Sequence, residues 1–306
     1  MLNNIGGTRL VPLRCMVPES SASVLVKLEL ENPTGSMKDR MALAMVEAAE
    51  AGGRLKPGGS VVEYTGGSTG VSLAFVCAVK RIPLHIVTSD AYSQEKRDHM
   101  AALGARLTVI RSRTGGTTGD LTREMIARAT ELAEDSGGVL TDQLNNEAPL
   151  AAYEVMGDEI WTQAGGAVDA FVHMVGTAGS LRGVSGLLRT RNPQVRIVAV
   201  EPAESAVLSG GASGSHDIEG TGAGFVVPLW DETIADEIQT VSTEEAMHTA
   251  RRLAREEGIF AGTSTGGNIA VALRVAAQLG AGKTVVTIAC DSGMKYLSTA
   301  LYTASG

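Results

Sequence analysis

Hydrophobic and polar residues alternate with a period of two from residue 24 to residue 30, which predicts a strand with one buried face. A short strand is predicted before it within residues 5–15, and an Ala- and Met-rich helical run follows it from about residue 40 to Gly52. Later strands are predicted at residues 61–64, 84–87, 106–110, 169–175, 196–200 and 285–289, and later helices at 71–81, 93–104, 120–134, 180–191, 242–258 and from 268 onward. Repeated strand and helix predict parallel sheets with helices on both faces. Because the pattern restarts near residue 169, we expect an α/β protein of two lobes.

The stretch from Asn32 to Arg40 joins the first long strand to the first helix. Its proline and glycine set a turn, and Ser36 is the predicted N-cap. Lys38 then lies near the positive end of the helix dipole, where protonation is disfavoured. A lysine with a lowered pKa is a nucleophile that commonly forms a Schiff base with a carbonyl cofactor. The alternative is a solvated lysine paired with Asp39.

Three loops rich in glycine and hydroxyl residues, 65–70, 176–180 and 262–267, each follow a strand and open an apolar helix. Helix N-termini present unpaired N–H groups to anions, and glycine lets an anion approach the backbone. Three such loops favour a ligand with several anionic groups, such as a phosphate and a carboxylate. Loop 176–180 is the best phosphate candidate, although a plain strand-to-helix turn would have the same pattern. His173, in the strand before it, is predicted to be a core residue.

Charge and cysteine usage exclude several other classes of protein. The formal net charge is -8 and no basic run has interleaved aromatic residues, which argues against a nucleic-acid partner. Gly282-Lys283-Thr284 and Gly220–Gly224 lack the contexts of a P-loop and a dinucleotide motif. Cys15, Cys77 and Cys290 are far apart and odd in number, so neither a metal site nor a disulfide is predicted, and a reducing cytoplasm is expected. No apolar run approaches the length of a membrane span.

Four motifs together resemble the fold-type II pyridoxal phosphate enzymes, which have a tryptophan synthase β-like fold, and most of all their cysteine synthase and cystathionine β-synthase branch. They are Pro-Thr-Gly-Ser-Met-Lys-Asp-Arg at 33–40, Thr-Gly-Gly-Ser-Thr at 65–69, Gly-Thr-Ala-Gly-Ser at 176–180 and Gly-Thr-Ser-Thr-Gly at 262–266. The resemblance runs almost from end to end. It implies a pyridoxal 5'-phosphate cofactor, a homodimer, a smaller substrate-binding lobe (35–145) and a larger cofactor-binding lobe (1–34 with 146–306).

The resemblance also implies roles for individual residues. Lys38 would hold the cofactor as a Schiff base and then move the α-proton of the substrate. A neutral serine, Ser264, would face the pyridine nitrogen, which makes the ring a weaker electron sink and favours β-elimination to an aminoacrylate. The cofactor would also be held by Ser68 near its 3'-oxygen and by Gly176, Thr177, Ala178, Gly179 and Ser180 at its phosphate. The substrate would be bound by Thr65, Gly66, Gly67, Thr69, Gln143 and Gly222.

The chain departs from the family pattern in its second motif. Where the family usually has Thr-Ser-Gly-Asn-Thr, Gly66 replaces a hydroxyl residue and Ser68 replaces an asparagine. Gly7 and Arg9 also stand where an N-terminal motif usually has asparagine and proline. We therefore expect the cofactor chemistry to be retained, whereas the substrate can differ from O-acetylserine.

The resulting hypothesis is β-replacement on an activated serine derivative, in which sulfide or another small thiol or amine adds to the aminoacrylate. A serine or threonine dehydratase of the same fold is the first alternative. The second is a binding protein that retains the fold without the chemistry.

Overall fold

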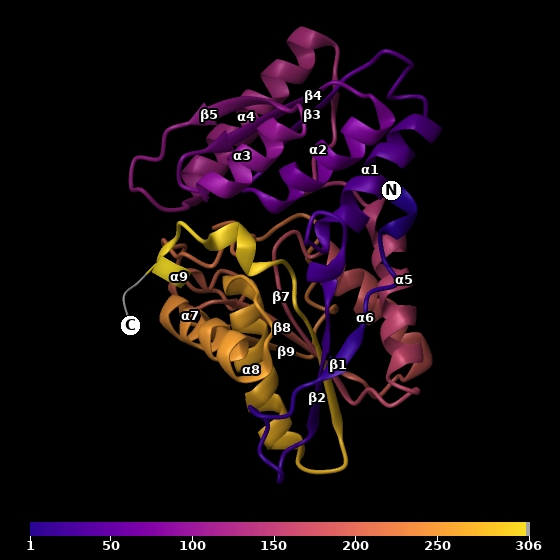
Figure 1. Cartoon of the computed structure of the whole chain (residues 1–306), viewed down its shortest axis with the longest axis vertical. Helices are drawn as coiled ribbons and strands as arrows, with labels where there is room; N and C mark the ends of the chain where they lie inside the picture. Colours follow the sequence, from indigo (N-terminus) through magenta and orange to yellow (C-terminus); the bar gives the residue numbers. More distant parts are fainter. Residues whose placement is uncertain (304–306) are drawn as a thin grey trace.

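The computed structural model describes residues 1–303 and contains two sheets, each flanked by helices (Figure 1). The smaller sheet has the strand order β5-β4-β3-β6, and every pairing in it is parallel. Its strands are β3 (Val61–Tyr64), β4 (Leu84–Ser89), β5 (Arg106–Ile110) and β6 (Val139–Leu140). The helices around it are α1 (Lys38–Ala51), α2 (Ser68–Lys80), α3 (Gln94–Ala102) and α4 (Gly119–Ser136). Helices α1, α2 and α3 lie on the side toward the larger sheet, and α4 covers the other face.

The larger sheet has the order β1-β2-β10-β7-β8-β9, and only the edge strand β1 is antiparallel to its neighbour. Its strands are β1 (Leu10–Pro12), β2 (Ser23–Lys27), β7 (Ala170–Met174), β8 (Arg196–Pro202), β9 (Glu237–Val241) and β10 (Thr284–Ile288). Helices α5 (Pro149–Gln163) and α6 (Gly179–Arg191) cover one face, and α7 (Thr243–Arg252) and α8 (Thr263–Leu279) cover the other. A short C-terminal helix, α9 (Ala300–Thr303), follows. The sheets are buried by helices on both faces, which explains the continuous apolar strands.

The strand order places chemically important segments at one edge of the larger sheet. β10 pairs in parallel with both β2 and β7, so the carboxyl ends of these three strands meet at the same edge. Those ends lead to the Lys38 turn, to loop 176–180 and to residues 290–291. In open α/β sheets this edge is where ligands bind.

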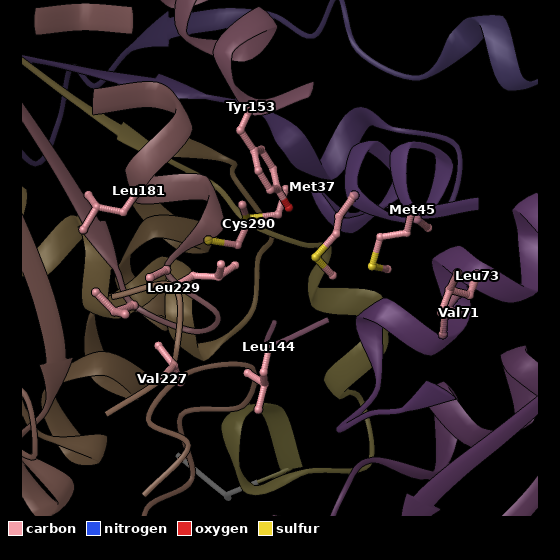
Figure 2. Close-up of a cluster of buried hydrophobic side chains, with 14 of the residues drawn as sticks. Met37, Met45, Val71, Leu73, Leu144, Tyr153, Leu181, Val227, Leu229 and Cys290 are labelled. Carbon is pink, nitrogen blue, oxygen red and sulfur yellow. The ribbon is translucent and has the colours of Figure 1, made fainter. Parts of the chain in front are cut away.

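One hydrophobic cluster joins the two halves of the molecule (Figure 2). It contains Met45 of α1 and Leu73 of α2, and also Leu181 of α6. Figure 2 shows Tyr153 reaching from α5 toward Cys290, close to Met37 at the start of α1. Apolar side chains from both lobes share this core, so the two lobes pack against each other there.

The α/β fold with two parallel-sheet lobes is confirmed, but several element boundaries differ from the prediction. Helix α2 begins at Ser68 instead of residue 71, and α8 begins at Thr263, so two of the three predicted loops form first helical turns. The N-cap of α1 is Met37 and not Ser36, whose hydroxyl accepts a 3.2 Å hydrogen bond from the Lys38 N–H. Helix α5 and strand β9 were not predicted, because the polar residues within them obscure their periodicity. The lobe limits at 35–145 and at 1–34 with 146–306 stay a prediction, and residues 304–306 lie outside the described part.

Candidate active site

A pocket lies between the carboxyl edges of the two sheets and encloses about 1080 Å³ of space, part of it open to solvent. It brings together most of the residues predicted to form the site, although they come from both lobes. Those that line it are Lys38, Thr65, Gly66, Gly67, Ser68, Thr69, Gln143, Gly176, Thr177, Ser180 and Ser264. Three predicted residues, Ala178, Gly179 and Gly222, are absent from its lining.

Lys38 is the first residue of α1 and lines the pocket. Its turn is held against the segment after β10, because the Met37 N–H donates to the Cys290 carbonyl (2.9 Å). Burial lowers the pKa of Lys38, opposed in part by Cys290 and Asp291. The direction matches the sequence expectation, but burial is the largest cause. The carboxylate of Asp39 accepts the Thr34 N–H (2.8 Å), and within residues 1–303 Lys38 forms no ion pair.

Loop 176–180 forms the turn into α6 with a conformation suited to an anion. Ala178 at the N-cap has a left-handed backbone (φ 67°), and a Cβ at Gly176 would lie 2.4 Å from the Gly220 carbonyl oxygen. A larger residue at position 176 would collide with that carbonyl oxygen. The start of α6 follows directly, and a helix N-terminus is a favourable place for an anion. His173 is buried as predicted, but it also lies on the pocket wall and hydrogen-bonds Ser180 (2.8 Å). Burial lowers the pKa of His173 to about 3, so it is neutral.

Ser264 is the second residue of α8, and its buried side chain is on the pocket wall. The next residue, Thr265, accepts the Cys290 N–H (3.0 Å), which fixes the start of α8 against the end of β10. Burial raises the pKa of the Cys290 thiol to about 12. The hydroxyl and the thiol are therefore both neutral groups at this side of the pocket.

The 65–69 loop and Gln143 are connected directly. Thr69 donates to the Gln143 side-chain oxygen (2.8 Å), and the Gln143 amide donates to the Tyr64 carbonyl (2.7 Å). The side-chain oxygen and nitrogen of Gln143 are thus both held by hydrogen bonds beside the N-terminus of α2. Helix N-termini attract carboxylates, so this corner suits a substrate carboxylate.

The structure shows what surrounds the two residues that depart from the family motif. A Cβ at Gly66 would lie 2.6 Å from the Tyr92 ring, so Tyr92 occupies the space of the missing side chain. The Ser68 hydroxyl donates to Asp291 (2.7 Å), which also accepts from Tyr296 (2.9 Å). Neither contact was predicted, because Tyr92 and Asp291 are 26 and 223 residues from their partners and only the fold brings them together.

The sequence analysis also missed an ion pair on the pocket wall. Lys96 at the start of α3 donates to Glu219 of the opposite lobe (2.6 Å). The ammonium nitrogen also lies 4.0 Å from the centre of the Tyr296 ring. Lys96 falls within the helix predicted at residues 93–104, and nothing in the local sequence connects it with Glu219.

The pocket fits pyridoxal 5'-phosphate on its own geometry. It has a lysine with a lowered pKa and a glycine-lined helix N-terminus for a phosphate. The Oδ1 atom of Asp291 is buried without a hydrogen-bond partner in the described residues, which leaves a polar position for a ligand. No group of three His, Cys, Asp or Glu residues able to hold a metal occurs within residues 1–303.

Comparison with known proteins agrees with this fit. The family model of pyridoxal-phosphate dependent enzymes matches residues 1–291, and the chain belongs to this family. Within it, the chain is 45% identical over 300 residues to a cysteine synthase of Staphylococcus aureus (strain Mu50), covering 97% of this chain and 95% of the relative.

Solved structures show the same likeness. A crystal structure of O-ureido-L-serine synthase superposes with a TM-score of 0.93 at 39% identity, covering 100% of this chain and 95% of that one. The cysteine synthase of Entamoeba histolytica gives a TM-score of 0.92 at 36% identity, covering 100% of this chain and 90% of that one.

Among the described residues, no helix is both long and apolar enough to cross a membrane.

Proposed function

We propose that the protein catalyses β-replacement on an activated serine derivative, with sulfide or another small nucleophile as the second substrate. The observation that carries this proposal is the convergence of Lys38, loop 176–180, Ser264 and the Thr69–Gln143 pair on one pocket. The cysteine synthase relatives support the same reaction class. When bound, pyridoxal 5'-phosphate supplies the electron sink that makes the α-proton and the β-substituent labile.

The residues of this chain have separate parts in the proposed reaction. The Lys38 amine, which burial favours in its unprotonated form, holds the cofactor and moves the α-proton of the amino-acid substrate. The backbone of residues 176–180 with Thr177 and Ser180 would hold the phosphate, and the Ser264 hydroxyl would contact the pyridine nitrogen. The 65–69 residues bind the substrate carboxylate beside Gln143. Although Ala178, Gly179 and Gly222 are not in the pocket lining, Ala178 and Gly179 still form the helix start that presents the N–H groups. For Gly222, we propose only that it lies near the amino group of the substrate.

The visible absorption spectrum of the purified protein tests this proposal. We expect a yellow protein whose absorption band changes on titration with one of serine, O-acetylserine or O-phosphoserine. Lys38→Ala should abolish the parent band, whereas the matched surface variant Lys80→Ala should retain it. A colourless protein that stays colourless with added pyridoxal phosphate would contradict the proposal and favour the binding protein.

Product analysis separates the two enzyme classes. β-Replacement predicts a new amino acid when a donor and sulfide are supplied together. Ammonia and pyruvate as the main products would instead establish the dehydratase. A homodimeric state and a cytoplasmic location are further proposals, to be tested by light scattering and by cell fractionation.

A further inference from the structure

A second hollow adjoins the active-site pocket and encloses about 910 Å³, part of it open to solvent. It lies between the start of α3, residues 216–219 and the C-terminal segment 296–300. Figure 1 shows that C-terminal segment, in yellow, along the side of the larger lobe that faces α3. Four residues line both spaces and form the shared wall between them: Tyr92, Thr117, Glu219 and Tyr296.

Two contacts between the lobes border this hollow. Glu95 accepts hydrogen bonds from the N–H (2.5 Å) and the hydroxyl (2.6 Å) of Ser298, which lines the hollow. Thr117 and His216, which also line it, form a β-bridge. The hollow therefore lies at the lobe boundary, with residues of both lobes in its lining.

The hollow contains an unsatisfied polar group. Ser93 is only 5% exposed and lines the hollow, yet its hydroxyl has no hydrogen-bond partner within residues 1–303. It occupies the N-cap position of α3 without making the capping bond that serines usually make there. A buried hydroxyl without a partner costs free energy, so its position points to a ligand atom that completes it.

The Lys96–Glu219 pair reaches the shared wall from the two lobes. The Lys96 stem passes so close to Gly67 that a Cβ there would lie 2.3 Å from it, and Gly67 has a φ of 142° that favours glycine. Lys96 is 2% exposed, and its nitrogen lies between Glu219 and the Tyr296 ring. Because solvent screens a buried charge only weakly, an unbalanced charge at this position would interact strongly with any charged group that passes the wall.

We propose that this hollow binds the uncharged polar tail of the nucleophilic second substrate, a small thiol or amine, and that the charges of Lys96 and Glu219 offset each other so that the wall favours neither a cationic nor an anionic tail. The inference rests on the proposed β-replacement and adds the position at which the second substrate is selected. The nucleophilic atom enters the main pocket past the shared wall while the tail stays in the hollow. Ser93 donates or accepts one hydrogen bond to the tail.

Three thiols that differ mainly in the charge of their tails test the charge selection: 2-mercaptoethanol (neutral), mercaptoacetate (negative) and cysteamine (positive). Lys96→Met leaves the Glu219 carboxylate without its partner, so kcat/KM for cysteamine should rise about tenfold relative to mercaptoacetate. Glu219→Gln leaves the Lys96 ammonium alone, so the same ratio should fall about tenfold. The value for 2-mercaptoethanol should change less than either.

A double variant and a matched control keep the test interpretable. Because a single variant leaves a charge in a dry site and can impair folding, Lys96→Met/Glu219→Gln removes both charges together. The ratio of its kcat/KM values for cysteamine and mercaptoacetate should return close to that of the parent. The Lys80–Glu50 pair, 2.7 Å apart at the surface, lies outside both spaces, so Lys80→Met/Glu50→Gln should leave kcat/KM for all three thiols unchanged.

Ser93→Ala tests the hollow independently of charge. Loss of one hydrogen bond to the tail should lower kcat/KM for 2-mercaptoethanol roughly 3- to 10-fold. The donor-induced spectral change, which needs no nucleophile, should stay as in the parent, and thermal stability should not fall because no protein partner is lost.

The outcomes separate this inference from the proposed function. Equal thiol ratios in all variants, or no effect of any thiol as nucleophile or inhibitor, would overturn the inference while the donor-induced spectral change still stands. If no donor changes the spectrum of the parent protein, the proposed function fails, and the inference fails with it.

Discussion

The sharpest prediction concerns Gly66 and Tyr92. The backbone at Gly66 lies outside the left-handed region, so a serine fits the chain there, but its Cβ would lie 2.6 Å from Tyr92 Cε1 and 2.8 Å from Cζ. Normal carbon contacts are about 3.5–4.0 Å, so the ring or the loop must move by about 1 Å. Overpacking of this kind costs roughly 1–3 kcal/mol.

The assay is a double-mutant cycle with thermal unfolding of the cofactor-loaded protein. Gly66→Ser alone should lower Tm by roughly 2–8 °C in a chain of this size. Tyr92→Ala removes the obstructing ring, so the combined Gly66→Ser/Tyr92→Ala variant should be more stable than the sum of the single effects, with a coupling of about 1 kcal/mol or more. Tyr92→Phe keeps the ring and should give no such relief. A Gly66→Ser protein as stable and active as the parent would refute the reasoning.

The same contact refines the expectation about substrate choice. Ser68→Asn with Gly66→Ser should shift preference toward O-acetylserine only when Tyr92→Ala is present, because the new serine otherwise displaces the 65–69 loop. Relative kcat/KM values for O-acetylserine and O-phosphoserine measure the shift. An unchanged preference in the triple variant would show that these positions do not set the donor.

Three further predictions follow from buried polar groups. Gln143→Leu removes the group that accepts the Thr69 hydrogen bond and the amide that donates to the Tyr64 carbonyl. The kcat/KM for the amino-acid substrate should therefore fall about tenfold or more. An unchanged value would show that Gln143 does not contribute to substrate binding. Burial lowers the pKa of Lys295 to about 8, so the charged ammonium is disfavoured in the folded state. This charge lowers the free energy of unfolding fully below pH 8, and the loss disappears as the pH rises toward 10.5. Lys295→Met should therefore raise stability by roughly 2–4 kcal/mol below pH 8, and the difference in Tm from the parent should shrink between pH 8 and pH 10. Arg40 donates hydrogen bonds to Glu29 (2.8 Å) and Glu159 (2.7 Å). Arg40→Met should therefore lower the free energy of unfolding, measured in urea, by roughly 3–5 kcal/mol. If Arg40→Met lowered it less than Arg40→Lys does, this network would not be stabilising.

The sequence by itself predicted the fold class, and its resemblance to a known family predicted the cofactor. Apolar strands alternating with helices specify parallel sheets, because each residue pattern depends only on local periodicity. The Lys38 turn and loop 176–180 could be read for the same reason: the glycines and hydroxyl residues that shape a helix start are neighbours in the chain.

Contacts between distant segments were decided by the tertiary structure. The pairing of β10 with β2 and β7 places Asp291 beside Ser68, and the approach of α3 to residues 216–219 forms the Lys96–Glu219 pair. The lowered pKa of Lys38 also arises mostly from burial, which a sequence does not display. Periodicity records which face of an element is buried, whereas the partner that covers that face depends on how the chain folds back on itself.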